Sequence, residues 1–191
     1  MSLGRTLSNL NMTILVRKPN LEILTDEGIP KDFADVRDYF NFAIQNNLLS
    51  WIPRKMPITT EEIRSKWIPS AKTNICYIAE LSGRVFGSAT VFYVPSSTAY
   101  EHALQRQEGE LASTTNPILG RKQSLDVDKE LSRAIINELK QTGKTAFARI
   151  AIESPAAEAM KELGYEGTLV KNVDRYKFQG LSGSVFEYNL P

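Results

Sequence analysis

The segment that most constrains the fold lies past the middle of the chain, where helix and strand patterns follow one another without a gap. Apolar residues at helical spacing predict a helix over 128–141, and Gly143 stands just past its end as a typical C-terminal glycine. A mostly apolar run over 147–152 predicts a buried strand. Ser154 and Pro155 suit the first positions of another helix. This succession predicts a β-α-β crossover, which requires parallel neighbouring strands.

The other patterns place strands on both sides of this unit. Strands are predicted over 13–17, 74–80, 84–94, 110–115, 169–178 and 184–190. Apolar spacing predicts a helix over 32–47, and the capping box of Thr59 and Glu62 begins a short helix that we expect Pro69 to end. The predicted order is β-α-α-β-β-β-α-β-α-β-β. It indicates an α/β fold with a mixed sheet and helices on both faces, a three-layer α/β/α arrangement.

Length and charge limit the possible classes of protein. The chain has 191 residues, of which 42% are hydrophobic, enough for one domain with a real core. The 23 basic and 22 acidic side chains give a net charge of +1, which argues against an electrostatic nucleic-acid binder. Residues 1–11 are polar and are predicted to be an N-terminal tail, with 12–191 as a single domain. No apolar run resembles a signal peptide or a membrane span, so we expect a cytoplasmic protein without a membrane partner.

The scarcity of cysteine and histidine excludes further chemistry. Cys76 and His102 are the only residues of their types. A disulfide framework is therefore impossible, and a Cys/His zinc site, which needs three or four such ligands, is not expected. No metal is predicted.

Two stretches carry a resemblance to a known family. One is the helix ending in Lys140-Gln141-Thr142-Gly143, followed at once by the buried strand. The other, over 160–166, is similar to the Y-x-K-x-G-F/Y ending of a helix in the GNAT superfamily of acetyl-CoA-dependent N-acetyltransferases. With the order of elements, the chain resembles this family from about Thr13 to Leu190. The resemblance implies a GNAT-like fold, acetyl-CoA as acetyl donor, an amine as acceptor, and pairing of two copies through the last strands.

The family's fold also implies where the coenzyme would lie. Its fourth and fifth strands part, here near Ala112 and Ile150, and main-chain groups of the fourth strand bind the pantetheine arm. In this sequence those residues would be Leu111, Ala112, Ser113 and Thr114. The pyrophosphate would lie on backbone amides at the start of the next helix, where donors are free and the helix dipole favours an anion.

The phosphate motif of the family, Q/R-x-x-G-x-G/A, is altered in this sequence. Counted back from Gly143 it falls on 123–128, with Asp126 and Asp128 at the glycine positions. A carboxylate there repels phosphate, and the simpler interpretation is that these aspartates cap the helix. A shifted anion site remains chemically reasonable, formed by Gly120, Arg121, Lys122, Gln123 and Ser124. The alternative is that the two cations are ordinary solvated loop charges.

The positions of the acid and the base of an acetyl transfer also depart from the family's pattern. Met160 stands where many family members have a tyrosine that protonates the leaving thiolate. Ser154 replaces a usual asparagine; it suits a helix cap and is kept as a candidate cofactor-binding residue, although the specific coenzyme contacts of the asparagine are lost. Glu110 occupies a position where the family often has a glutamate acting through water. His102 has a pKa suited to proton transfer near neutrality, and Tyr100 could replace the missing acid. The simpler interpretation is an exposed carboxylate at a strand end for Glu110 and a surface residue for His102.

Two functions therefore remain open. The first is an N-acetyltransferase that moves an acetyl group directly from acetyl-CoA to an amine, without a covalent intermediate. The second is a catalytically degenerate relative that binds acyl-CoA or a partner in a regulatory or structural role. The altered positions Asp126, Asp128 and Met160 favour the second, and the variable loops 48–57 and 95–109 leave the acceptor unnamed.

Overall fold

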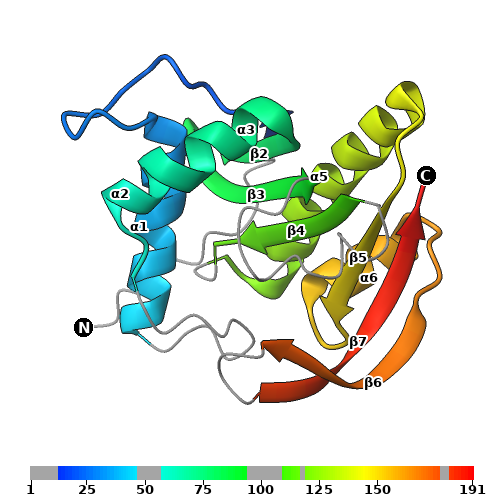
Figure 1. Cartoon of the computed structure of the whole chain (residues 1–191). Helices are drawn as coiled ribbons and strands as arrows, with labels where there is room; N and C mark the ends of the chain where they lie inside the picture. Colours follow the sequence, from blue (N-terminus) through cyan, green and yellow to red (C-terminus); the bar gives the residue numbers. More distant parts are fainter. Residues whose placement is uncertain (1–12, 47–56, 94–108, 117–118, 177–180) are drawn as a thin grey trace.

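The computed structural model describes residues 13–46, 57–93, 109–116, 119–176 and 181–191. Its strands form one mixed sheet in the order β1-β2-β3-β4-β5-β7-β6. The strands are β1 (Ile14–Arg17), β2 (Ile75–Leu81), β3 (Arg84–Phe92), β4 (Gly109–Thr115), β5 (Ala146–Ala151), β6 (Thr168–Tyr176) and β7 (Leu181–Leu190). The helices are α1 (Lys31–Gln45), α2 (Thr60–Glu62), the π-helical segment η1 (Ile63–Trp67), α3 (Ile68–Thr73), α5 (Arg121–Thr142) and α6 (Pro155–Glu162). Figure 1 shows how these elements are arranged.

The sheet combines antiparallel hairpins with a single parallel pair. The strands β2 and β3 form the predicted hairpin through the turn at Ser82 and Gly83, and both turn residues have positive φ. The only parallel neighbours among the described strands are β4 and β5, joined by α5 as the crossover pattern predicts. The mixed α/β fold inferred from the sequence is confirmed.

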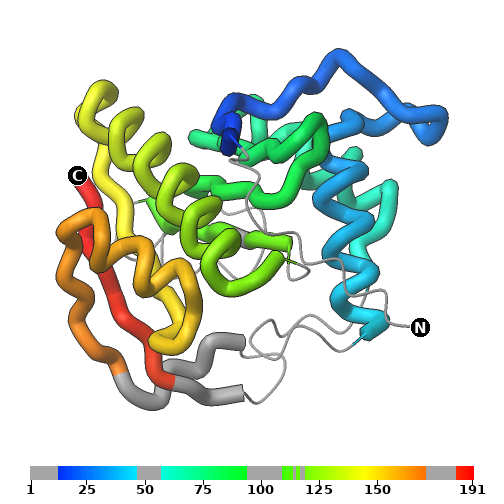
Figure 2. Tube along the Cα trace, turned by 180° about the vertical axis from the view of Figure 1, so that it is seen from behind, coloured from blue at the N-terminus to red at the C-terminus, as the bar shows by residue number. Residues whose placement is uncertain are grey.

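Helices cover both faces of the sheet. On one face α1 packs against β2 and β3, where Val36 and Tyr39 meet Ile78 and Val85. On the other face α5 crosses β1 to β4, and α6 lies beside it against β5, as the rear view in Figure 2 shows. The main core lies under α5 and contains the fully buried residues Ala79, Val91, Val127, Leu131, Ile135, Leu139, Ala148 and Met160. The layers are α/β/α, as predicted.

The helix after Thr59 continues further than expected. Its cap is as predicted, because the Thr59 side chain accepts a hydrogen bond from the Glu62 amide. Pro69, however, does not end the helix, which continues through α3 to Thr73. The preceding turn widens into η1, in which the amide of Ile68 bonds to the carbonyl of Ile63 five residues back. A wide turn ahead of the proline lets the chain remain helical without the missing N–H donor.

The central helix begins earlier than its apolar pattern predicts. It starts at Arg121 instead of 128, about two turns sooner, with Gly120 as N-cap. Ser124 and Asp128 occupy the sheet-facing positions of these first turns and are buried, so no apolar periodicity marks them in the sequence. At its other end Gly143 has φ of 65° and closes the helix as expected.

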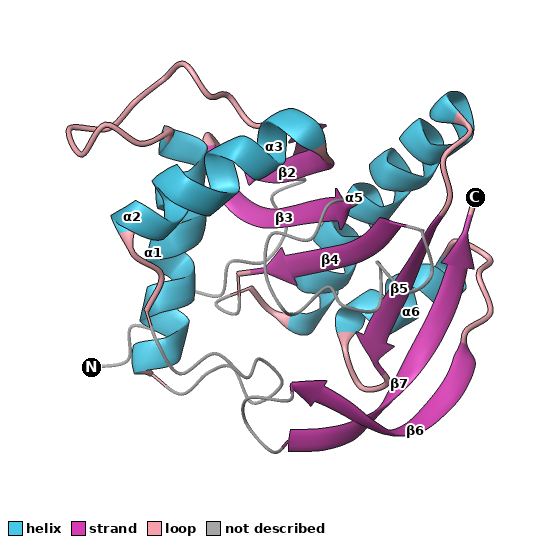
Figure 3. Cartoon of the chain, viewed as in Figure 1, coloured by secondary structure: helices cyan, strands magenta, loops and turns pink. Residues whose placement is uncertain are grey.

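The chain ends in an antiparallel pair at the edge of the sheet. The strand β7 lies between β5 and β6, so the last strand is inserted beside the crossover unit, as Figure 3 shows. Residues 1–11, predicted to be a tail, lie outside the described residues. Among the described helices, none has both the length and the apolar character that crossing a membrane requires.

Candidate functional site

The two parallel strands separate after a short stretch of pairing. The ladder between β4 and β5 runs from Gly109↔Ala146 to Leu111↔Ala148. Beyond Leu111, β4 continues to pair with β3, and beyond Ala148, β5 continues to pair with β7. In Figure 1 the arrowheads of β4 and β5 accordingly point in different directions. The parting expected near Ala112 and Ile150 is therefore present.

The main chain of β4 directs hydrogen-bonding groups into this gap. The amide of Gly109 bonds to Thr145 on the β5 side, whereas the amide of Asn116 bonds to Phe86 on β3. Because successive amides of a strand alternate in direction, the odd-numbered residues of β4 face β5. The N–H groups of Ser113 and Thr115 therefore point to the gap past the end of the ladder. Of the residues that the resemblance names, Ser113 has its amide at this place, whereas the amides of Ala112 and Thr114 face β3 and Thr115 was not among them.

Both crossover helices begin at the end of the sheet where the strands separate. The first hydrogen bond within α5 runs from the Ser124 amide to the Gly120 carbonyl at 2.9 Å, so the amides of Arg121, Lys122 and Gln123 precede it. Gly120 supplies no side-chain cap, and the first turn contains no acidic residue. These amides and the positive end of the helix dipole form an environment suited to an anion.

The start of α6 lies next to the start of α5. Ser154 caps α6 by accepting from the Ala157 amide at 3.3 Å, as predicted. The Arg121 guanidinium bonds to the Glu158 carboxylate at 3.0 Å and to the carbonyl of Glu153 at 3.3 Å. The two helix N-termini and the gap between the strands thus lie at one end of the sheet.

Asp126 and Asp128 do not cap the helix, contrary to the simpler interpretation of the sequence. Both lie inside α5, one turn or more past its start. Asp126 is half-buried, with its carboxylate 4.0 Å from the Lys129 amine. Asp128 is buried and accepts a hydrogen bond from the Thr115 hydroxyl at 2.6 Å. The helix start that could meet a phosphate is therefore formed by 120–124, where the alternative anion site was predicted.

Glu110 lies on the face of the sheet opposite α5. Its neighbour Leu111 packs into the core under α5, so the alternation of a strand directs Glu110 to the other face. Its atom Oε2 is buried without a hydrogen-bond partner in the described part of the chain. Burial raises the pKa of this carboxyl to about 7, with the Arg149 charge opposing the rise and Glu187 adding to it. A carboxyl with this pKa can accept a proton near neutral pH.

An ion pair accompanies Glu110 on the same face. Arg149 on β5 and Glu187 on β7 are cross-strand partners, and Arg149 Nε lies 2.9 Å from a Glu187 carboxylate oxygen. The Arg149 guanidinium also lies 5.7 Å from the centre of the Phe147 ring. Neither charged residue was singled out from the sequence. The pairing of β7 with β5 places Arg149 and Glu187 near Glu110, and no local sequence motif predicts that pairing.

Three further positions were considered for proton transfer in the sequence: Met160, His102 and Tyr100. Met160 is fully buried in the core under α5, so the position of the family's tyrosine is occupied by packing. His102 and Tyr100 lie outside the described residues. In the described segments, no group of three or more histidine, cysteine, aspartate or glutamate side chains could hold a metal ion.

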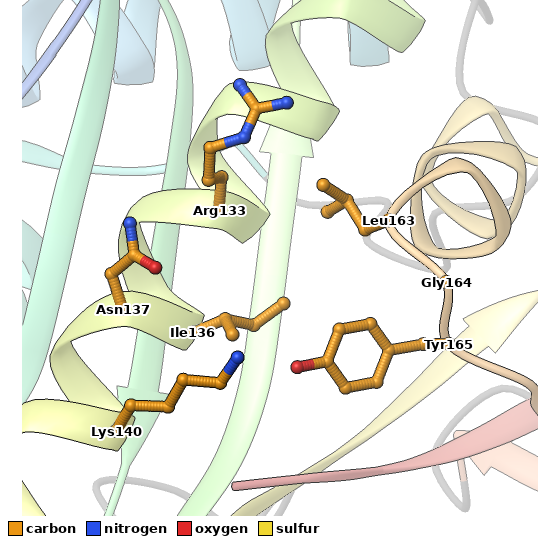
Figure 4. Close-up of a pocket in the computed structure, with 7 residues that line it drawn as sticks. All are labelled: Arg133, Ile136, Asn137, Lys140, Leu163, Gly164 and Tyr165. Atoms are coloured by element: carbon orange, nitrogen blue, oxygen red, sulfur yellow. The ribbon is translucent and has the colours of Figure 1, made fainter.

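A separate groove lies at the far end of the two helices. It has a volume of about 330 Å³ and lies between the C-terminal half of α5 and the turn after α6. Figure 4 shows Arg133, Asn137 and Lys140 on one side, with the Lys140 amine facing the Tyr165 hydroxyl across the groove. None of the predicted coenzyme residues lines it. A charge removed from this groove can therefore serve as the control for a charge removed from the start of α5.

Comparison with solved structures identifies the architecture. An N-acetyltransferase of Staphylococcus aureus Mu50 matches 93% of this chain and 98% of its own at 19% identity, with a TM-score of 0.64. A GNAT superfamily phosphinothricin acetyltransferase of Sinorhizobium meliloti, in complex with AcCoA, matches 94% of this chain and 89% of its own at 18% identity, with a TM-score of 0.66. The chain has the GNAT fold.

A further solved structure has the same fold, although comparison of sequences finds no match. A putative acetyltransferase of Salmonella typhimurium, with its cofactor acetyl-CoA, matches 93% of this chain and 92% of its own at 20% identity, with a TM-score of 0.63. No protein-family model matches the chain, and no curated protein matches it in sequence. The likeness to these proteins is therefore one of fold, at 18–20% sequence identity.

Proposed function

We propose that this GNAT-fold protein is an N-acetyltransferase that moves an acetyl group from acetyl-CoA to an amine. The observation that carries the proposal is the parting of β4 and β5 after the pair Leu111↔Ala148, with main-chain donors of β4 facing the gap. GNAT-fold neighbours from Salmonella and Sinorhizobium were solved with acetyl-CoA, which supports this coenzyme as the donor.

Binding of the donor would use the main chain more than side chains. The amides of Ser113 and Thr115 would bind the pantetheine arm, and Leu111, Ala112 and Thr114 would line its path along β4. The pyrophosphate would lie at the start of α5, on the amides that precede the first helical hydrogen bond. The residues proposed for this anion site are Gly120, Arg121, Lys122, Gln123 and Ser124. Ser154 at the start of α6 would complete it.

Catalysis would consist of positioning and proton transfer. The acceptor's ammonium group must lose a proton before or during its attack on the thioester carbonyl, and the buried Glu110 carboxyl with its pKa of about 7 is suited to accept that proton through water. A β4 amide would polarise the carbonyl as negative charge develops on its oxygen. The tetrahedral intermediate then collapses by breaking the C–S bond, and the departing thiolate takes a proton from Tyr100 or from solvent. His102 is the second candidate base.

The test separates this function from that of a binding protein. The purified protein is titrated with acetyl-CoA and with CoA while its melting temperature is followed. Ligand at 100 times its Kd should stabilise the fold by about 2.7 kcal/mol. A shift together with acetylation of at least one member of a broad amine panel supports the enzyme, whereas a shift without transfer supports a degenerate relative that binds acyl-CoA. No shift at millimolar ligand would overturn both.

A further inference from the structure

A buried carboxylate fixes the end of β4 beside the proposed coenzyme cleft. Asp128, in the second turn of α5, is 5% exposed and accepts a hydrogen bond of 2.6 Å from the hydroxyl of Thr115. Thr115 is the last residue of β4, and its amide faces the gap between β4 and β5. The bond therefore joins the start of the helix to a strand end that, among the described residues, has no strand partner on its β5 side.

Burying the Asp128 carboxylate at this position costs free energy of folding. Its helix neighbours on the same face, Val127 and Leu131, are fully buried and apolar. Burial raises the pKa of Asp128 to about 6 even though the bond from Thr115 lowers it, so the carboxylate is poorly solvated. The nearby charges do not compensate, because Lys129 is paired with Glu162 on the outer side of the helix at 2.9 Å. An apolar residue would pack there at lower cost, which points to a role beyond stability.

We propose that Asp128 is a positioning residue that holds Thr115, and with it the last donor of β4, in the arrangement that receives the coenzyme. The inference depends on the proposed function, because it concerns the same cleft. Asn116, the next residue, bonds through its amide to Phe86 on β3, so the strand end is held by β3 on one side and by Asp128 from below. Without the carboxylate, Thr115 would lose its bond to α5, and the strand end would depend on its pairing with β3.

The experiment compares coenzyme binding in matched variants of the full chain. Asp128→Ala and Thr115→Val each remove the bond, whereas Asp128→Asn and Thr115→Ser each retain an acceptor or a donor. We expect CoA affinity, measured by calorimetry, to fall about tenfold in the first pair and to stay within about threefold of the parent in the second. Combining Asp128→Ala with Thr115→Val should weaken binding no further than either change alone, because both break one interaction.

The control is Ser132→Ala, one turn further along α5. Ser132 is also polar and 5% exposed, so this change removes a buried polar group from the same helix while the bond between Asp128 and Thr115 stays intact. It should leave CoA affinity unchanged. In turnover assays the bond-breaking variants should raise KM for acetyl-CoA while kcat and KM for the amine stay constant, a pattern that simple destabilisation does not produce.

Failure of the inference is distinguishable from failure of the proposed function. If the parent binds CoA and Thr115→Val binds it equally well, the bond is only structural and the inference is overturned. Thr115→Val is nearly isosteric, so the test stands even if Asp128→Ala does not fold. If the parent itself binds no CoA, the proposed function falls, and the positioning role falls with it.

Discussion

Leu111 and Ala148 form the last pair of the parallel ladder, and beyond them, in the part of the chain that the structure describes, β4 and β5 pair only with their outer neighbours. The separation leaves the amides of Ser113 and Thr115 directed at a gap instead of at a strand. Unpaired main-chain donors at the centre of a sheet are unfavourable unless water or a ligand satisfies them. This is the physical reason for expecting a ligand at this place, and it does not depend on any side-chain motif.

Replacing Ser113 by proline should abolish coenzyme binding without unfolding the protein. Proline removes an N–H, and at Ser113 that N–H is not used in the ladder with β3, so the sheet tolerates the change as an edge strand does. Ser113→Ala keeps the N–H and serves as the control. We expect the proline variant to lose the CoA-induced rise in melting temperature and the alanine variant to retain it. Equal shifts in the two variants would mean that this amide does not contact the coenzyme.

Glu110→Gln should lower turnover and remove a pH dependence. Because burial raises the pKa of Glu110 to about 7, the carboxylate is available as a base only above neutral pH. The parent's kcat/KM for acetylation of the fastest amine in the panel should therefore rise with an apparent pKa near 7. In the glutamine variant kcat should fall by about 10²-fold or more, and this step in the profile should vanish. A profile unchanged by the substitution would assign the base elsewhere, with His102 the next candidate.

The same substitution should stabilise the protein at high pH. The pKa of Glu110 lies higher in the folded state, about 7 against its ordinary value of 4.5, so the stability that this group contributes is complete below about pH 4.5 and is lost as pH rises through 7. Glutamine carries no charge and escapes this loss. After allowance for partial solvent screening, Glu110→Gln should be more stable than the parent by about 1–2 kcal/mol at pH 8.5 and equal to it at pH 4. Urea unfolding at the two pH values measures the difference, and a variant less stable at pH 8.5 would contradict it.

Lys122→Ala should weaken binding of CoA more than binding of its uncharged fragment. Lys122 is exposed in the first turn of α5, where no acidic residue accompanies it. If the pyrophosphate lies there, loss of this cation should reduce CoA affinity about three- to tenfold at low salt while S-acetylpantetheine binds as before. Lys140→Ala removes the same charge from the groove at the other end of α5 and is the matched control. Equal effects of the two changes would indicate a general charge effect rather than a phosphate site.

Most of the fold was predictable because its elements carry local signals. Hydrophobic periodicity, the Thr59 capping box, the Ser154-Pro155 start and Gly143 each report on a few neighbouring residues, and the structure confirms them. Two boundaries of elements were predicted wrongly, for different reasons. Pro69 was expected to end a helix that a π-turn allows to continue, and the helix start at Arg121 was hidden because buried polar residues fill its core positions.

The site was less predictable because it depends on contacts between distant segments. The bond between Asp128 and Thr115 joins a helix to a strand end, and the pair Arg149 and Glu187 depends on the insertion of β7 beside β5. Neither leaves a spacing signature in the sequence. The aspartate at 128 drew attention only as a departure from a glycine motif, and its predicted role as a cap was wrong. Because α5 begins at Arg121, Asp128 lies in its second turn and is buried against β4, which the predicted start at 128 did not allow.

Gly109→Ala should destabilise the protein without changing its intrinsic affinity for CoA. A Cβ at Gly109 would lie 2.4 Å from Val91 Cγ1 and 2.7 Å from the Tyr93 ring, closer than packed atoms allow, so β3 and β4 would have to shift. Overpacking of this kind costs about 1–3 kcal/mol, which urea unfolding will show as a lower midpoint. Gly120 is the contrasting position, because a Cβ there meets nothing within 4 Å, and alanine at this N-cap should cost only about 0.5–1 kcal/mol, the preference of an N-cap for glycine over alanine. If the phosphate approaches the backbone at Gly120, Gly120→Ala should weaken CoA binding and leave the unfolding midpoint nearly unchanged. Gly109→Ala should do the reverse, lowering the midpoint and leaving CoA affinity unchanged.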